Sequence, residues 1–280
     1  MATEVEHLSR SGVNMLLDWA AAEGWNPGLD DAAPFHAADP EGFLILRVDG
    51  QPAAAVSVVR HDADIAFLGL FICAPEFRGR GLGARVFAAG LSHAEGRSVG
   101  LDAVPAEVDR YAAMGFAASF SSRRWSGDVP QEWAARRSRS PDPAELMAMT
   151  TADQRAEGYR RDAFLAAWWT DAPGRRTLIL SDRSGEVQGW ATVRRCRDGL
   201  KIGPLNARTP DDAQSLIGDC AMALGASRVA IDIPSDAEPL WRMLERADFS
   251  PQFATTRMWK GTAPSRIPRF LNATATLELG

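Results

Sequence analysis

Cysteine is scarce in this sequence, and long apolar runs are absent. Only three of the 280 residues are cysteines (Cys73, Cys196 and Cys220), and they are widely spaced without any C-x-x-C pair. This pattern argues against a disulfide framework and against a zinc site. No apolar stretch approaches the roughly 18–20 residues that a membrane helix needs, and the acid-containing start has no signal-peptide character. The sequence therefore predicts a cytoplasmic protein that binds neither a membrane nor a metal.

An excess of basic charge is also missing. Lysine and arginine total 31 against 36 aspartate and glutamate residues, a formal charge of −5. This balance disfavours nucleic-acid binding as the main function. The histidines show no metal-ligand spacing; they are His7, His36, His61 and His93. With 46% hydrophobic and 24% charged residues, the chain has the composition of a globular protein, and its length allows one large domain or two ordinary ones.

The first half alternates between strand-like and helix-like patterns, which indicates an α/β fold. Apolar runs predict strands at residues 43–48, 53–59, 65–73, 99–104 and 116–125. Helical spacing predicts helices at residues 13–20, 84–91 and 105–115. Asp49-Gly50, between the first two of these strands, is a strong hairpin signal.

The second half repeats the first in a weakened form. Four features recur in the same order at an offset of about 130–135 residues. The clearest is Ile231-Asp232-Ile233-Pro234, which matches the segment from Leu101 to Pro105. Between the halves lies a polar, proline-marked stretch, which is typical of a linker. We therefore predict two copies of one fold at residues 1–128 and 143–280, joined by a linker at 129–142.

Three glycines at alternate positions follow the strand predicted at 65–73. Gly79, Gly81 and Gly83 alternate with Arg78 and Arg80 and lead directly into a helix. Glycine lets backbone amides approach a ligand closely, and a helix N-terminus favours negative charge, so the loop predicts a pyrophosphate site. The spacing is not G-x-G-x-x-G, and no G-K-[ST] follows, which disfavours a dinucleotide or a nucleoside triphosphate. The alternative is a tight strand-to-helix turn with ordinary surface arginines.

The run from Phe71 to Gly83 resembles the acetyl-CoA signature of the GNAT N-acetyltransferase family, in which a strand, a proline and an R/Q-x-x-G-x-G/A loop precede a helix. The resemblance implies that acetyl-CoA is the co-substrate and that its pyrophosphate is held by Arg78, Gly79, Arg80, Gly81, Leu82 and Gly83. It also implies that the backbone of Phe71, Ile72 and Cys73 hydrogen-bonds the pantetheine arm like an added strand. Residues 110–116 resemble the family's Y-x-x-x-G-F ending, which implies that Tyr111 lies beside the CoA sulfur.

The resemblance extends to a tandem subfamily, in which a catalytic GNAT domain is followed by a divergent second copy. The segments similar to this group are 24–28, 203–205, 231–234 and 276–280. The resemblance implies two tandem GNAT-like domains, each a mixed, mostly antiparallel twisted sheet flanked by helices. The second copy has no glycine at residues 206–212, so we expect only the first to bind CoA. One departure is Pro105-Ala106-Glu107, which stands where many members carry an asparagine.

Direct acetyl transfer needs an acid, a polarised carbonyl and a base. Tyr111 is the candidate acid, because a phenol with a pKa near 10 can protonate a leaving thiolate at neutral pH; the alternative is a packed ring whose hydroxyl bonds a backbone carbonyl. The backbone N–H of Ile72 or Cys73 is the candidate carbonyl-polarising donor. The Cys73 thiol is expected to pack as a small apolar group. Asp102 has a counterpart, Asp232, in the copy without the loop, which favours a structural role for both. The other options for the base are Asp62, Asp64, His61 and Glu23, and no base is identified.

Trp25 and Asn26 are candidates for lining an acceptor pocket between the domains. The sequence thus predicts an N-acetyltransferase that moves the acetyl group of acetyl-CoA to a primary amine of a small molecule. The alternative from a different class is a non-catalytic acyl-CoA sensor. The acceptor's identity, the second domain's part in binding it and the oligomeric state are not predicted.

Overall fold

The computed structural model describes residues 2–280. Strands of the first half are β1 (Thr3–His7), β2 (Phe43–Val48), β3 (Gln51–Arg60), β4 (Ile65–Cys73), β5 (Ser98–Ala103) and β6 (Ala117–Asp128). Its α-helices are α1 (Arg10–Ala22), α2 (Ala32–Ala38), α3 (Leu82–His93) and α4 (Val108–Ala113). Strands of the second half are β7 (Arg175–Ser181), β8 (Val187–Arg195), β9 (Leu200–Ala207), β10 (Arg228–Pro234), β11 (Ser250–Lys260) and β12 (Leu271–Ala273). Its α-helices are α5 (Pro143–Glu157), α6 (Asp162–Trp168), α7 (Pro210–Leu224) and α8 (Glu238–Arg246).

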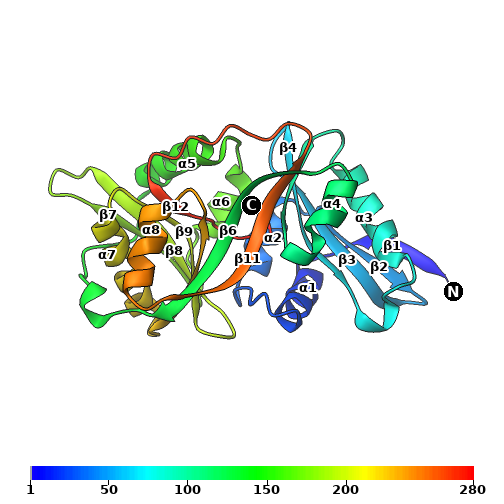
Figure 1. Cartoon of the computed structure of the whole chain (residues 1–280), viewed down its shortest axis with the longest axis horizontal. Coiled ribbons are helices and arrows are strands. Elements are labelled where there is room, and N and C mark those ends of the chain that lie inside the picture. Colours follow the sequence, from blue (N-terminus) through cyan, green and yellow to red (C-terminus); the bar gives the residue numbers. More distant parts are fainter. Residues whose placement is uncertain (1) are drawn as a thin grey trace.

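One continuous, twisted sheet runs through both halves (Figure 1). Its strand order is β1-β2-β3-β4-β5-β11-β6-β10-β9-β8-β7, with β12 paired to β9. Pairing is antiparallel except between β4 and β5 and between β9 and β10, which are parallel. The two halves therefore share one topology, and the predicted α/β fold with mixed, mostly antiparallel sheets and flanking helices is confirmed.

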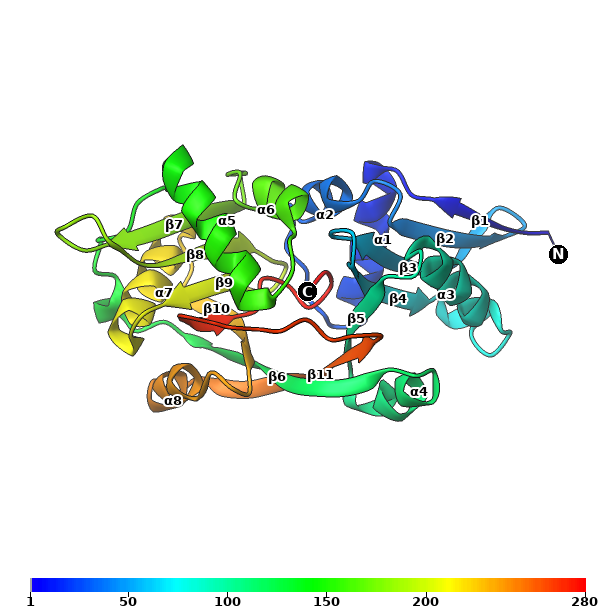
Figure 2. The ribbon, with the colours of Figure 1, turned by 90° about the horizontal axis from the view of Figure 1, so that it is seen from above.

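Strands β6 and β11 are exchanged between the halves. β11 pairs with β5 of the first half, and β6 pairs with β10 of the second. The two exchanged strands lie side by side across the middle of the molecule (Figure 2). Each half's sheet is therefore continued by the final long strand of the other half. The sheet has no break at residues 128 to 142. The domain boundaries predicted there therefore remain a prediction.

Two buried ion pairs join each exchanged strand to the strand of the other half with which it pairs, β11 to β5 and β6 to β10. Arg257 of β11 donates to both carboxylate oxygens of Asp102 on β5, at 2.9 and 2.8 Å. Arg124 of β6 donates in the same way to Asp232 of β10, at 2.8 and 2.9 Å. Burial opposes the charge on Asp232, but the Arg124 guanidinium and nearby cations outweigh it and lower the pKa of this carboxyl. At Asp102 burial outweighs the adjacent Arg257 and raises the pKa of the carboxyl. Each aspartate is bound to an arginine in the sheet, so neither is a free base.

Local sequence signals set the ends of several elements. The Ser9 side chain caps α1, and Asp142 and Glu145 form a capping box at the start of α5. Asp49 and Gly50 both have positive φ, 48° and 81°, as a two-residue type I′ hairpin turn requires. The predicted hairpin between residues 43–48 and 53–59 is therefore confirmed as β2 and β3.

A shared hydrophobic core connects the halves. Phe35 of α2 stacks on Trp168 of α6, with ring centroids 6.0 Å apart. The ring of Phe164 lies 4.9 Å from that of Trp168, and all three side chains are fully buried. Burial of this much aromatic surface stabilises the contact strongly, so the two halves are packed against each other and not merely tethered.

Strands β4 and β5 diverge after four residue pairs. Their parallel pairing ends at Leu68 with Leu101. Beyond this point β4 stays paired with β3 as far as Cys73, with a register shift around Leu70, whose φ is +46°. A bulge of this kind bends its strand. An opening therefore lies between β4 and β5 beyond Leu68 and Leu101.

The corresponding gap in the second half is filled by the chain itself. Parallel pairing of β9 with β10 ends at Ile202 with Ile231. β12 then adds to β9 opposite Leu205–Ala207, and the Thr274 N–H donates to the carbonyl of Asp232 at 2.9 Å. Residues 274–280, here called the closing segment, continue from β12 into the middle of the molecule, between the halves (Figure 2).

Candidate active site

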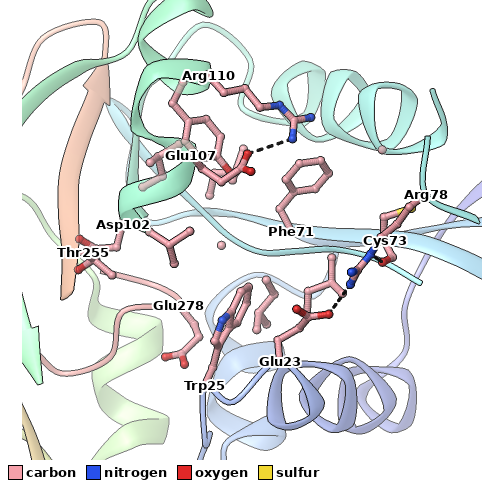
Figure 3. Close-up of a pocket in the computed structure, with 18 of the residues that line it drawn as sticks. Glu23, Trp25, Phe71, Cys73, Arg78, Asp102, Glu107, Arg110, Thr255 and Glu278 are labelled. Carbon is pink, nitrogen blue, oxygen red and sulfur yellow. Dashed lines mark hydrogen bonds and ion pairs between the residues drawn. The ribbon is translucent and has the colours of Figure 1, made fainter. Parts of the chain in front are cut away.

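A cavity of about 760 Å³ occupies the opening between β4 and β5 (Figure 3). Its first-half walls come from β4, the glycine loop at residues 78–83, the start of α3, β5 and α4. The second half supplies further wall residues from β11 and the closing segment, namely Phe253, Thr255, Leu277 and Glu278. The cavity is therefore built by both halves, although the glycine loop belongs to the first alone.

Most of the residues predicted from the sequence line this cavity. They are Phe71, Ile72, Cys73, Arg78, Gly79, Arg80, Gly81, Leu82, Gly83, Tyr111 and Trp25. Asn26 is not among the lining residues. Its side-chain amide donates to the carbonyl of Asp198 at 2.8 Å, and its side-chain oxygen accepts from the Asp198 N–H at 3.2 Å. Asn26 thus fastens the first half to a loop of the second.

The glycine loop leaves a helix N-terminus open. Gly81 is the N-cap of α3 with φ +75°, and no side chain caps the first-turn amides. Gly79 has φ +74°, and a Cβ at either glycine would meet nothing within 4 Å. These glycines are required by the left-handed backbone and leave the amides uncovered. Uncovered amides together with the helix dipole form an anion site.

The two loop arginines have different contacts. The Arg78 Nε donates to the carbonyl of Cys73 at 2.9 Å, and its Nη2 donates to Glu23 at 2.5 Å. The guanidinium of Arg80 lies 5.6 Å from the centre of the Phe77 ring, and its side chain is exposed. Positive charge therefore flanks the open amides of α3, and Arg78 also ties the loop to the end of β4.

The edge of β4 that faces the opening carries unpaired backbone amides. The Ala74 N–H donates to the carbonyl of Ala53 on β3, so the amide of Cys73 lies on the opposite edge because successive amides alternate. By the same alternation Ile72 faces β3. Of the two predicted donors, the geometry favours Cys73. Burial raises the pKa of the Cys73 thiol, which keeps it protonated, as expected for an apolar packing role.

Tyr111 lies in the wall of the cavity formed by α4. Its ring centre is 6.1 Å from that of Phe87 and 5.8 Å from that of Phe116. Burial, with a smaller contribution from Glu107, raises the pKa of its phenol to about 12. Tyr111 therefore holds its proton at neutral pH, as an acid for a leaving thiolate must.

Sequence reasoning missed the cavity residues that the second half supplies. Glu278 is 5% exposed, and one of its oxygens accepts from the Thr276 hydroxyl. Burial alone would raise the pKa of this carboxyl, but Lys201, the Thr276 hydrogen bond and two arginines together lower it. Thr255 is buried, and its Oγ1 has no hydrogen-bond partner among residues 2–280. The similarity of residues 276–280 to the tandem subfamily was the one signal, and it did not indicate their position.

Residues 2–280 contain no group of three or more histidine, cysteine, aspartate or glutamate side chains that could hold a metal ion. Over the same range, no helix is both long enough and apolar enough to cross a membrane.

Known proteins resemble the chain along nearly its whole length. Residues 12–120 match the acetyltransferase (GNAT) family, and residues 149–269 match an acetyltransferase (GNAT) domain. Holothin acyltransferase from Pseudoalteromonas sp. (strain SANK 73390) is 32% identical over 273 residues, which span 94% of this chain and 90% of that protein.

Solved structures share the fold. A crystal structure from Pyrococcus horikoshii has a TM-score of 0.78 at 20% identity and covers 99% of this chain and 96% of its own. The tandem GNAT protein from the clavulanic acid biosynthesis pathway has a TM-score of 0.63 at 16% identity, over 94% of this chain and 100% of its own. Together with the family matches, these likenesses make the repeat two GNAT domains in tandem, and the chain belongs to the GNAT family of acetyltransferases as an acyltransferase.

Proposed function

We propose that this protein transfers the acetyl group of acetyl-CoA to a primary amine of a small molecule. The observation that carries the proposal is the content of one cavity: the open N-terminus of α3, the free edge of β4 and the protonated Tyr111 all line it. The relative named holothin acyltransferase supports acyl transfer as the reaction.

Acetyl-CoA is proposed to enter from the side of the glycine loop. Its pyrophosphate binds the amides at the start of α3, with Arg78 and Arg80 beside them. Its pantetheine arm lies along the free edge of β4, which accepts it as a strand accepts a neighbour. This direction brings the thioester into the part of the cavity that Cys73 and Tyr111 line.

The transfer itself is proposed as one direct step. The neutral amine attacks the thioester carbonyl carbon while the Cys73 N–H polarises the carbonyl oxygen. A C–N bond forms, the C–S bond breaks, and the thiolate takes the Tyr111 proton. The acylated nitrogen then loses its extra proton to water, and a proton from water restores the Tyr111 phenol. Because an alkylammonium has a pKa near 10, the amine must lose its proton to water or a base before its lone pair can attack.

The test is release of free CoA from acetyl-CoA with a panel of primary amines, followed with a thiol reagent. Amine-dependent release is the expected result. CoA binding by calorimetry without release for any amine would instead support the non-catalytic sensor, and binding of NAD in place of CoA would contradict both proposals.

A further inference from the structure

We propose that Glu278 binds the protonated amino group of the acceptor, which makes the acceptor a cationic amine with an apolar or aromatic body. This inference rests on the proposed acetyl transfer in the same cavity and extends it to the chemical class of the acceptor. It assigns the closing segment, which belongs to the second half, a direct part in the reaction of the first.

Glu278 is the one acidic side chain of the cavity wall without an arginine partner. Four acidic residues line the cavity, and three of them form ion pairs. These pairs are Glu23 with Arg78 at 2.5 Å, Asp102 with Arg257 at 2.8 Å and Glu107 with Arg110 at 3.0 Å. Among residues 2–280, Glu278 has no ion pair within 4.0 Å, and its carboxylate accepts from the Thr276 hydroxyl through Oε2. Its Oε1 is therefore available to a ligand.

The backbone places Glu278 at the inner end of the opening. A Cβ built on Gly69 would lie 2.0 Å from the Glu278 carbonyl oxygen, so β4 and the closing segment are in backbone contact there. Gly69 directly follows Leu68, the last residue of β4 that pairs with β5. Figure 3 shows Glu278 beside Trp25, on the side of the cavity away from Cys73 and Arg78. CoA and the acceptor can therefore approach the thioester from opposite sides.

The carboxylate of Glu278 is kept charged by cations that do not form an ion pair with it. Lys201, with Arg194 and Arg124, keeps the pKa of Glu278 low in spite of its burial, but Lys201 itself donates to the carbonyl of Trp25 at 3.1 Å. These cations offset the cost of burying the carboxylate, but none of them lies within 4.0 Å of it among residues 2–280, so its free oxygen has no cation in direct contact. An ammonium group brought to the free oxygen supplies a charge-assisted hydrogen bond, so the site favours a cation over a neutral group.

The rest of this wall fits an apolar body with one further polar group. Trp25, Phe253 and Leu277 line the same cavity, and Trp25 lies beside Glu278 (Figure 3). The Thr255 Oγ1, which is buried and has no partner among residues 2–280, can bond a polar group of the acceptor. A flat aromatic amine satisfies these features better than a strongly hydrated one.

The test compares two amines of nearly the same shape and different charge. 2-Phenylethylamine is a cation at neutral pH, whereas O-benzylhydroxylamine, with oxygen in place of the carbon beside nitrogen, is weakly basic and neutral. CoA release is measured with both for the wild-type protein, Glu278→Gln and Glu278→Asp. The exposed, salt-bridged Glu186 provides the matched control, because Glu186→Gln removes a carboxylate of the second half outside the cavity.

We expect Glu278→Gln to raise the KM for 2-phenylethylamine about ten- to hundredfold, the range for a hydrogen bond to a charged group. The KM for O-benzylhydroxylamine should change less than about threefold by the same reasoning. Glu278→Asp should keep the preference for the cation, and Glu186→Gln should change neither value. CoA affinity by calorimetry should be equal in all variants, which separates the effect from loss of the fold or of the CoA site.

An equal rise in both KM values, or no rise for the cation, would overturn the role of Glu278. Loss of the cation preference in Glu278→Asp would overturn it too. A wild-type protein that uses neither amine contradicts the acceptor class assigned to the cavity. By contrast, a wild-type protein that releases no CoA with any primary amine overturns the proposed transferase function on which this inference rests.

Discussion

The openings in the two sheets begin alike and end differently. β4 leaves β5 after Leu68, and β9 leaves β10 after Ile202. Both β4 and β9 have a register shift against their other neighbour near this point. In the first half the gap beyond is the cavity, whereas in the second half β12 lies in it. The fold itself therefore makes an opening, and what lies in the opening decides whether that half can bind a ligand.

The helices that follow the two openings also differ, because the N-terminus of one is uncapped and that of the other is capped. α3 begins at Gly81 without a side-chain cap. α7 begins at Thr209, whose hydroxyl accepts from the Asp212 N–H at 3.1 Å, and its first turn carries two acids. A capped and acidic N-terminus repels an anion, while an uncapped one attracts it. Two features of the second half thus argue against a CoA site there, a filled gap and a capped, acidic helix end.

The largest expected effect is on the open helix end. Gly81→Trp should weaken CoA binding roughly a thousandfold or more, because a bulky side chain would cover the α3 amides from a backbone position with positive φ. Calorimetry with CoA measures this, and the melting temperature of the variant checks its fold. A folded variant that binds CoA normally would show that the pyrophosphate lies elsewhere.

The second-largest effect is expected on the rate of acetyl transfer, when Tyr111 in the first half is changed. Tyr111→Phe should lower kcat about 10²–10⁴-fold, the usual contribution of a positioned acid, and leave CoA affinity unchanged. Because the pKa of Tyr111 is raised to about 12, the wild-type rate should show no decline from phenol ionisation up to about that pH. Amine-dependent CoA release over a pH series tests both expectations, and an unchanged kcat would assign the acid to another group.

Removing the buried arginine of either exchanged strand should lower the unfolding free energy by a similar amount. Arg257→Met and Arg124→Met each leave a buried aspartate without its partner, which should cost about 3–5 kcal/mol of unfolding free energy. Urea unfolding measures the loss. Replacing both members of one pair, as in Asp102→Leu with Arg257→Met, should recover most of it. A much larger loss of unfolding free energy for one arginine variant than for the other would show that the two ion pairs do not stabilise their halves equally.

The smallest effect is expected at the closed helix end. Thr209→Ala removes the cap of α7 and should lower the unfolding free energy by about 1 kcal/mol. CoA affinity should stay the same, since the second half has no open gap. A second molecule of CoA bound by this variant, detected as a changed stoichiometry in calorimetry, would mean that the cap alone had closed the site.

What could be predicted from the sequence depended on residues close together along the chain. The glycine loop, the hairpin at Asp49-Gly50 and the helix that carries Tyr111 are local patterns, and their positions followed from spacing. The strand exchange was not predictable. β6 and β11 carry the similar segments Arg123-Arg124-Trp125 and Arg257-Met258-Trp259, so their own sequences allow either strand to complete either sheet.

The acceptor side of the cavity was also beyond sequence reasoning. Glu278 reaches Gly69 only because the closing segment crosses between the halves, and the neighbouring contact of His61 with the Leu279 carbonyl joins residues 218 positions apart. Nothing local in residues 276–280 indicates such a path. Asn26 illustrates the opposite error: it follows Trp25 directly, yet its side chain bonds Asp198, because adjacent residues face different directions.

The exchange of β6 and β11 has a consequence for the order in which the molecule is made. Asp102 and its partner Arg257 are 155 residues apart, so a growing chain emerges with β5 as an unpaired edge until β11 has been synthesised. Such an edge invites pairing with other chains, and contacts of this sequence separation form slowly. The wall that carries Glu278 is completed later still. A nascent chain therefore presents the glycine loop long before the second-half wall is in place, and the cavity is the last part of the protein to be assembled.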